Sequence, residues 1–130
     1  MIVFMCQHGA AKSVVAAAYF NRTAEREGLP YRAVAFAAET PWDAVPENVS
    51  ALLTRDGFSV GAFKPRHFAT ADLESAAKVV AIGCECGKLD ACDVAIEQWN
   101  DIPEMSVDLP ASAAAIRRHV EKLVQQLKAP

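Results

Sequence analysis

Short apolar runs alternate with longer amphipathic segments along this chain. The runs predict β-strands at residues 2–6, 31–37, 78–83 and 93–97. The segments between and after them predict helices at residues 12–27, 46–57, around 70–74 and at 110–128. Nearly uninterrupted apolar strands that alternate with helices are typical of a parallel sheet covered on both faces. The pattern therefore predicts an α/β fold, a three-layer α/β/α sandwich around a central four-stranded parallel sheet.

Residues that favour helix ends mark the limits of these helical segments. Gly28 and Pro30 are expected to end the first helix, and Gly57 the second. Thr70 is expected to cap the third helix, whose first turn contains Asp72. The last helix has one apolar stripe, formed by Ile116, Val120, Leu123, Val124 and Leu127. The sequence thus marks the helix limits and, in the last helix, the face that packs.

Length and charge narrow the class of protein. With 130 residues the chain is expected to form one domain, residues 1–130, that buries most of its apolar surface. A formal net charge of −3 and the lack of a basic run argue against nucleic acid or an anionic membrane as a partner. No apolar stretch reaches the roughly 18 residues of a membrane span, and the N-terminus does not resemble a signal peptide. We expect a cytoplasmic protein with a small partner.

The first strand leads into a segment with candidate chemistry. Cys6 ends the strand, and Lys12 and Ser13 begin the helix after a loop that contains Gly9. Because glycine accepts positive φ, the loop can curl and turn its N–H groups inward, beside the positive end of the helix. Such a cradle fits an oxyanion and favours a thiolate at Cys6, which Ser13 could hydrogen-bond; the alternative is a buried structural cysteine. The predicted oxyanion-binding residues are Gln7, His8, Gly9, Ala10, Ala11 and Lys12.

Three further cysteines follow the third apolar run: Cys84, Cys86 and Cys92. In a chain with an adequate core they do not resemble a secreted disulfide framework, which leaves catalytic, redox, metal-binding or packing roles. The spacing lacks a paired two-residue gap and an evident fourth ligand, so we expect no metal site. Cys6 and Cys84 each end a predicted strand. If these strands are neighbours, both sulfurs lie at the same edge of the sheet.

Several motifs occur in an order that resembles one family over nearly the whole chain. They are Val3-Phe4-Met5-Cys6 with the loop and Lys12-Ser13, Glu39-Thr40-Pro41, Asp56-Gly57-Phe58, Lys64-Pro65-Arg66, Ile82-Gly83-Cys84 and Trp99-Asn100-Asp101-Ile102-Pro103. Together they resemble the low-molecular-weight protein tyrosine phosphatases and the related thioredoxin-coupled arsenate reductases. The resemblance implies the fold of that family and a reaction in which a loop cysteine attacks phosphorus or arsenic.

By this resemblance Cys6 is the nucleophile, Lys12 and the loop amides hold the oxyanion, and a carboxylate on a late loop protonates the leaving oxygen. The chain departs from the family at three points. Lys12 replaces an arginine, and a lysine offers a point charge where a guanidinium offers a planar fork. Gly9 replaces an asparagine. The usual Asp-Pro pair is not intact, which leaves Asp101 and Glu104 as candidates for the acid, and we favour Asp101.

The resemblance also implies a thiol relay. The reductases pass a disulfide from the loop cysteine to the cysteine that ends the third strand and then to another; here these are Cys84 and Cys92, with Cys86 an unexplained extra. We therefore predict an arsenate reductase without a bound cofactor that uses a thioredoxin-like reductant as its partner. The alternatives are a phosphatase that hydrolyses a phosphate ester through Cys6, and a degenerate relative that binds an oxyanion or a phosphorylated partner without turnover.

Four residues near the predicted cradle have two interpretations each. His8 could tune the thiolate or face solvent. Trp42 could form a wall for the substrate or pack over the loop. Lys64 and Arg66 could border the cleft or belong to a solvated loop.

Overall fold

The structure, a computed structural model, describes residues 1–83 and 96–129. Its strands are β1 (Ile2–Cys6), β2 (Ala33–Ala37), β3 (Lys78–Ile82) and β4 (Ile96–Trp99). Its helices are α1 (Lys12–Arg26), α2 (Glu47–Arg55), α3 (Thr70–Glu74) and α4 (Leu109–Lys128).

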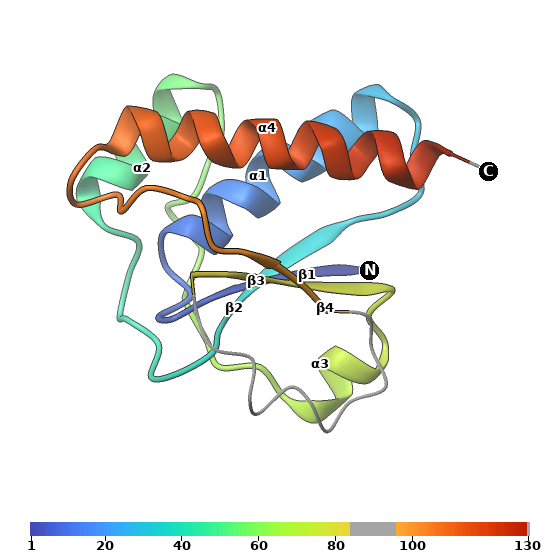
Figure 1. The fold of residues 1–130 in the computed structure, drawn as a ribbon. Coiled ribbons are helices and arrows are strands. Elements are labelled where there is room, and N and C mark those ends of the chain that lie inside the picture. Colours follow the sequence, from blue (N-terminus) through green and yellow to red (C-terminus); the bar gives the residue numbers. More distant parts are fainter. Residues whose placement is uncertain (84–95, 130) are drawn as a thin grey trace.

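The four strands form one parallel sheet in the order β2-β1-β3-β4. Phe4 of β1 stands beside Ala35 of β2 and Val80 of β3, so β1 is a central strand. Helices α1 and α4 cover one face of the sheet, and α3 lies on the other face (Figure 1). This arrangement confirms the predicted three-layer α/β/α sandwich with a four-stranded parallel sheet.

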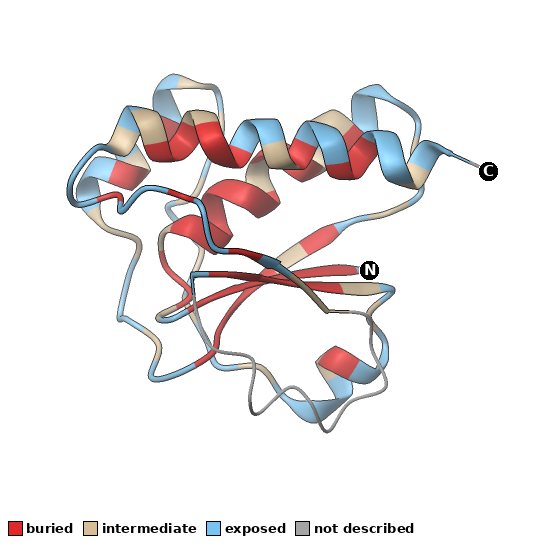
Figure 2. Ribbon diagram, in the orientation of Figure 1, coloured by how far each residue is buried: buried red, intermediate tan, exposed pale blue. Residues whose placement is uncertain are grey.

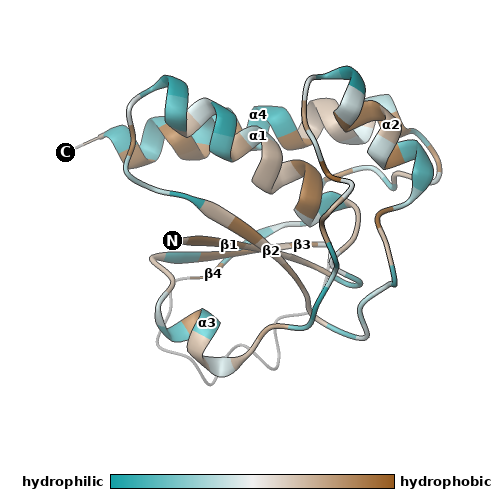
Figure 3. Cartoon of the chain, turned by 180° about the vertical axis from the view of Figure 1, so that it is seen from behind, coloured by the Kyte–Doolittle hydropathy of each residue, from teal (hydrophilic) through white to brown (hydrophobic). Residues whose placement is uncertain are grey.

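Alternate residues of β1 pack into two apolar clusters on opposite faces of the sheet. Ile2 and Phe4 pack with residues of α1 and α4, whereas Val3 and Met5 belong to the cluster that contains Leu73 of α3. Every residue of β1 is therefore buried, which explains why the strand has no charged side chain (Figure 2). By contrast, α4 carries hydrophilic residues along its outer side (Figure 3).

Some element limits differ from the predicted ones, and the pairing of the strands explains two of the differences. β2 begins at Ala33 and not at residue 31, because β1 supplies no pairing residue before Ile2, whose N–H donates to the carbonyl of Arg32. β4 continues to Trp99, beyond the predicted end at residue 97, because it pairs with β3 up to Ile82. Residues 93–95 of that predicted strand lie outside the described residues.

The predicted cap of α3 is also corrected. Thr70 is the first helical residue and does not cap the helix; the carboxylate of Asp72 instead accepts a hydrogen bond from the N–H of Ala69 at 2.7 Å. α4 begins at Leu109, one residue before the predicted start, and Asp108 caps it. Both carboxylates lie where helix N-termini favour negative charge.

The sheet brings two chain segments together at the carboxyl ends of its strands. β1 ends at Cys6 and its neighbour β3 ends at Ile82, just before Gly83. The two strands are neighbours, which is the condition under which Cys6 and Cys84 would share one edge of the sheet, but Cys84 itself lies outside the described residues. Among the described helices, none combines the length and the apolar character needed to cross a membrane.

Candidate active site

The loop that follows β1 turns its carbonyl groups toward residues 38–42. The carbonyl oxygens of Cys6, Gln7 and His8 accept hydrogen bonds from N–H groups of that segment at 2.9, 2.9 and 3.2 Å. Because a trans peptide holds its N–H opposite its C=O, the N–H groups of the residues that follow point away from the 38–42 segment. This is the backbone arrangement that a concave anion site requires.

Gly9 occupies a position in this loop that no other residue fits. Its φ is +64°, in the left-handed region. A Cβ built there would lie 2.6 Å from the backbone nitrogen of Ala37 and 2.9 Å from its Cα. The loop thus packs directly on the end of β2, and the glycine serves both the turn and this close approach.

The thiol of Cys6 lies at the base of the loop. Its Sγ is 3.0 Å from Oγ of Ser13, and both residues are buried. α1 begins at Lys12 after Ala11, whose side chain offers no acceptor for the first N–H groups of the helix. These N–H groups and the positive end of the helix can therefore serve a bound anion and a thiolate.

Lys12 is the only lysine or arginine among the described residues that surround Cys6. Its Nζ lies 3.0 Å from Oε1 of Glu104, and the exposed fractions of the two side chains are 11% and 70%. A Cβ on Gly83 would lie only 3.1 Å from the same Nζ, so the ammonium group rests against the backbone at the end of β3. Lys12 is held between two strand ends, whereas Glu104 reaches it from the protein surface.

The segment between β4 and α4 presents Glu104 to the site. Ile102 and Met105 on either side of it are each only 7% exposed and join the main core. The carbonyl of Glu104 accepts hydrogen bonds from the N–H groups of Val107 and Asp108 at 3.1 and 3.0 Å, which closes a turn. Two buried anchors and this turn fix the backbone and leave the Glu104 side chain free to point outward.

Asp101, the carboxylate favoured from the sequence, lies elsewhere. It accepts a hydrogen bond from Nε2 of His119 at 2.8 Å, and the His119 ring stacks on Trp99 with ring centroids 4.7 Å apart. The His119 hydrogen bond lowers the pKa of the Asp101 carboxyl, so this group is ionised at neutral pH. Among the described residues that line the cavity at Cys6, Glu104 is present and Asp101 is not.

A cavity of about 400 Å³ opens beside Cys6. The His8 ring stacks on Trp42 at 4.8 Å between centroids, and its Nδ1 donates to the carbonyl of Thr40 at 2.8 Å. Trp42 therefore packs over the loop and also lines the cavity, and its role as a wall for the substrate stays a prediction. The described lining residues are Cys6, Gln7, His8, Ala10, Ala11, Lys12, Trp42, Pro46, Asn48, Val49, Ile82, Gly83, Glu104, Met105 and Ser106.

Sequence reasoning missed part of this lining. In the sequence, Val49 resembles an ordinary core residue of a helix, and Met105 belongs to no recognisable motif. Only their positions could have suggested a place in the cavity wall, because Val49 lies in the first turn of α2 and Met105 follows a candidate acid. Tertiary packing, which no local pattern shows, brings both to the cavity.

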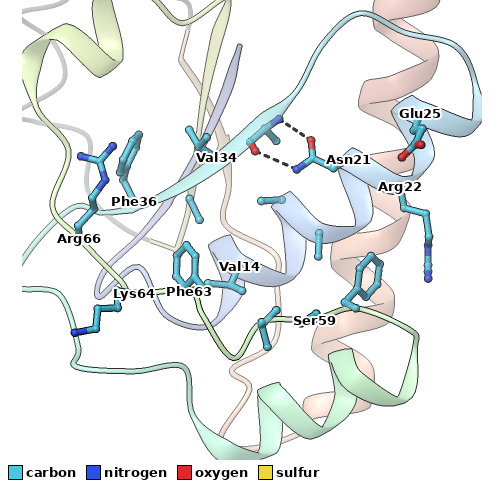
Figure 4. Close-up of a pocket in the computed structure, with 16 residues that line it drawn as sticks. Val14, Asn21, Arg22, Glu25, Val34, Phe36, Ser59, Phe63, Lys64 and Arg66 are labelled. Atoms are coloured by element: carbon cyan, nitrogen blue, oxygen red, sulfur yellow. Dashed lines mark hydrogen bonds between the residues drawn. The ribbon is translucent and has the colours of Figure 1, made fainter.

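A second cavity, of about 620 Å³, lies between α1, β2 and residues 58–66 (Figure 4). Lys64 and Arg66 line this groove and not the cavity at Cys6. The Arg66 guanidinium lies 4.4 Å from the centroid of the Phe36 ring. Asn21 closes part of the open edge of β2, because its amide exchanges two hydrogen bonds with the backbone of Ala33 at 2.7 and 3.1 Å.

The predicted relay residues Cys84 and Cys92, together with Cys86, lie outside the described residues. Within residues 1–83 and 96–129, no three His, Cys, Asp or Glu side chains come together in a way that could hold a metal ion. The described part of the site is therefore the cradle, its cation, one carboxylate and the cavity wall.

Fold and site together define a class of protein: a parallel α/β sandwich with a cysteine thiol at the base of a concave loop that leads into a helix. A family model described as low molecular weight phosphotyrosine protein phosphatase matches residues 1–102. The chain belongs to this family, which comprises cysteine-dependent phosphatases and arsenate reductases.

Similar proteins include two that are named arsenate reductases. A Halobacterium salinarum protein named "Putative arsenate reductase" is 32% identical over 97 residues, which are 74% of this chain and 68% of that protein. The crystal structure of an arsenate reductase from Archaeoglobus fulgidus is 26% identical, with a TM-score of 0.71 over 96% of this chain and 99% of that one. YfkJ from Bacillus subtilis has a TM-score of 0.84 at 20% identity, over 98% and 96% of the two chains, and so shows the shared fold.

Proposed function

We propose that the protein is a cysteine-dependent arsenate reductase. The observation that carries the proposal is the Cys6 thiol, 3.0 Å from Ser13 Oγ, in a cavity that it shares with the loop amides and with Lys12. Similarity to the proteins from Halobacterium and Archaeoglobus supports the reductase branch. The positions of Cys84 and Cys92 in the sequence supply the further thiols that reduction needs.

In the first step, the Cys6 thiolate attacks the arsenic of a hydrogenarsenate ion that the loop N–H groups and the Lys12 ammonium hold. A sulfur–arsenic bond forms and one arsenic–oxygen bond breaks. The departing oxygen leaves as water, with one proton from the arsenate and one from an acid of the protein. Backbone N–H groups that point into a concave loop stabilise the negative charge on the remaining oxygens.

We propose Glu104 as that acid, in place of Asp101. Glu104 lines the cavity and can reach a leaving oxygen there, whereas Asp101 is hydrogen-bonded to His119 and is absent from the described lining of the cavity. An acid must hold its proton and lie within hydrogen-bond reach of the departing atom. Glu104 meets the second condition in this structure.

Reduction then requires a second thiol. Cys84 attacks Sγ of Cys6, so that a disulfide forms and the sulfur–arsenic bond breaks. The electron pair of that bond stays on arsenic, which passes from As(V) to As(III) and leaves as arsenite. Cys92 next attacks Cys84 and releases the Cys6 thiolate. A dithiol protein of the thioredoxin class reduces the disulfide between Cys84 and Cys92 and takes up the oxidation.

The test is arsenate-dependent consumption of NADPH in the presence of thioredoxin and thioredoxin reductase. We expect turnover by the unmodified protein and none by Cys6→Ser. Cys84→Ser should form the arsenic adduct but release no arsenite. If the unmodified protein gives no more turnover than Cys6→Ser, the reductase proposal fails.

A second candidate, hydrolysis of a phosphate monoester, is favoured by the cavity wall. Trp42, Val49 and Met105 extend the cavity beyond the cradle and offer apolar contact to an organic group, which arsenate lacks. The same Cys6 attack would break the phosphorus–oxygen ester bond, Glu104 would protonate the alcohol, and water would hydrolyse the thiophosphate. Full hydrolysis of p-nitrophenyl phosphate by Cys84→Ser, with no arsenate turnover by the unmodified protein, would favour this reaction.

A further inference from the structure

The cation that the described residues supply to the candidate active site is already paired with an anion from the chain. Of the described residues that line the cavity at Cys6, Lys12 is the only lysine or arginine and Glu104 is the only carboxylate. The two side chains are in contact at 3.0 Å. Among the described residues that line this cavity, the other titratable groups are the Cys6 thiol and the His8 imidazole. An oxyanion that enters the cradle therefore meets a lysine that already forms an ion pair with Glu104.

The two partners differ in how firmly they are held. The Lys12 side chain is only 11% exposed, and its ammonium lies against Gly83, so it has little freedom to leave the cavity. The Glu104 side chain is 70% exposed and projects from a backbone that Ile102 and Met105 hold on either side. A fixed cation and a movable anion allow the anion to be exchanged without any change in the fold.

We propose that Glu104 is an internal counter-anion, which occupies Lys12 in the ligand-free protein and competes with an incoming oxyanion for it. The inference rests on the proposed binding of an oxyanion at this cradle. The lysine ammonium is a compact point charge, so it cannot present the planar fork with which an arginine binds two oxygens side by side. A doubly charged oxyanion beside an ionised Glu104 would also repel it.

This exchange couples binding to catalysis. While Glu104 Oε1 accepts the hydrogen bond of the Lys12 ammonium at 3.0 Å, that carboxylate is engaged and cannot serve a leaving oxygen. When an oxyanion takes over Lys12, the Glu104 carboxylate is released beside the leaving oxygen, where it can take up a proton from solvent water and donate it to that oxygen. The acid thus becomes available only when the substrate is in place. Because the substrate must displace Glu104 from Lys12, its affinity for the site is lower.

The test measures the affinity of inorganic phosphate, an unreactive probe, by isothermal titration calorimetry. Glu104→Gln removes the competing charge and keeps the shape of the side chain. We expect phosphate to bind this variant about three- to ten-fold more tightly than the unmodified protein, the scale of one charge a few ångströms away in a solvent-exposed site. Glu39→Gln removes the same charge from an exposed residue of the neighbouring loop and should change the affinity less than about 1.5-fold.

The outcomes separate this inference from the proposed function. Tighter binding by Glu104→Gln alone supports the counter-anion. Equal or weaker binding by Glu104→Gln, with measurable binding by the unmodified protein, overturns the inference and leaves the cradle intact. If neither protein binds phosphate, the oxyanion cradle is wrong and the inference fails with it. A similar gain in Glu39→Gln would attribute the effect to net charge and would also overturn it.

Discussion

The candidate active site is built from two chain segments of opposite character. Residues 6–13 form a loop between a buried strand and a buried helix start, with Cys6 and Ser13 each less than 10% exposed. Residues 100–108 cross the surface between β4 and α4, and their contribution, Glu104, is 70% exposed. The chemical groups of the first segment, Cys6 and Ser13, are thus buried, whereas the second segment presents an exposed Glu104 between the buried Ile102 and Met105.

The difference separates two tasks of the site. Nucleophilic attack needs a thiol held at one distance from the bound oxyanion, and the buried loop provides that precision. Proton transfer needs a group that can change its charge, and exposure to water makes that change inexpensive. A substitution that disturbs the backbone of the loop should therefore affect folding, and a substitution of Glu104 in the surface segment should affect rates.

The largest expected effect is on the stability of the loop. Gly9→Ala places a Cβ 2.6 Å from the backbone nitrogen of Ala37 and requires positive φ of an alanine. We expect a loss of about 2–4 kcal/mol in the free energy of unfolding, measured by urea denaturation. Gly61→Ala is the matched control, because a Cβ there has open space and the backbone is not in the left-handed region. A loss for Gly9→Ala no greater than that for Gly61→Ala would contradict the close packing of the loop on β2.

In the surface segment, Glu104→Gln should leave the fold unchanged and lower kcat. Removing a general acid lowers kcat by about 10²-fold, whereas an ion pair with one exposed partner contributes about 1 kcal/mol or less to stability. Because the same change removes competition for Lys12, KM should fall together with kcat. Steady-state arsenate reduction and urea denaturation of the same preparation measure the two effects. A variant with unchanged kcat would remove Glu104 from the role of acid.

Ser13→Ala examines the loop without disturbing its backbone. The Ser13 hydroxyl, 3.0 Å from Cys6 Sγ, can donate to a thiolate, and its loss should slow alkylation of Cys6 by iodoacetamide at neutral pH about ten-fold. Ser112→Ala is a suitable control, since Ser112 is also buried but its hydroxyl has no hydrogen-bond partner among the described residues. Equal alkylation rates in Ser13→Ala and the unmodified protein would show that the hydroxyl does not activate the thiol.

The sequence predicts the first segment well because its signals are local. A strand-ending cysteine, a glycine and a lysine at a helix start lie within eight residues, and each conformational preference acts on the chain itself. The packing requirement that allows only glycine at position 9 is not a local signal. It depends on Ala37, a contact between distant parts of the chain, which the loop sequence does not contain.

The second segment escapes prediction because its geometry comes from tertiary contacts. Asp101 and Glu104 are equivalent as local signals: both are acidic and both flank Ile102-Pro103. What separates them is the burial of Ile102 and Met105 and the position of His119, eighteen residues beyond Asp101 on α4. The limits of β4 likewise follow from its pairing with β3 and not from its own composition.

The smallest expected effect is that of Asp101→Asn, which separates the roles of Asp101 and Glu104 within the surface segment. Asp101→Asn removes a fully exposed carboxylate whose hydrogen bond goes to His119, so kcat for arsenate should stay within about two-fold of the unmodified protein. Its effect on stability should be slight and should depend on pH. Because the folded state lowers the pKa of Asp101, the stability that it contributes is present above the unfolded pKa of about 4 and is lost as the pH falls through the folded value. Thermal unfolding at pH 7 and at pH 3 should therefore show a small drop in Tm for Asp101→Asn at pH 7 and a smaller one at pH 3.

A large loss of kcat in Asp101→Asn, with kcat of Glu104→Gln unaffected, would instead return the role of acid to Asp101. It would also mean that the surface segment rearranges when the oxyanion binds.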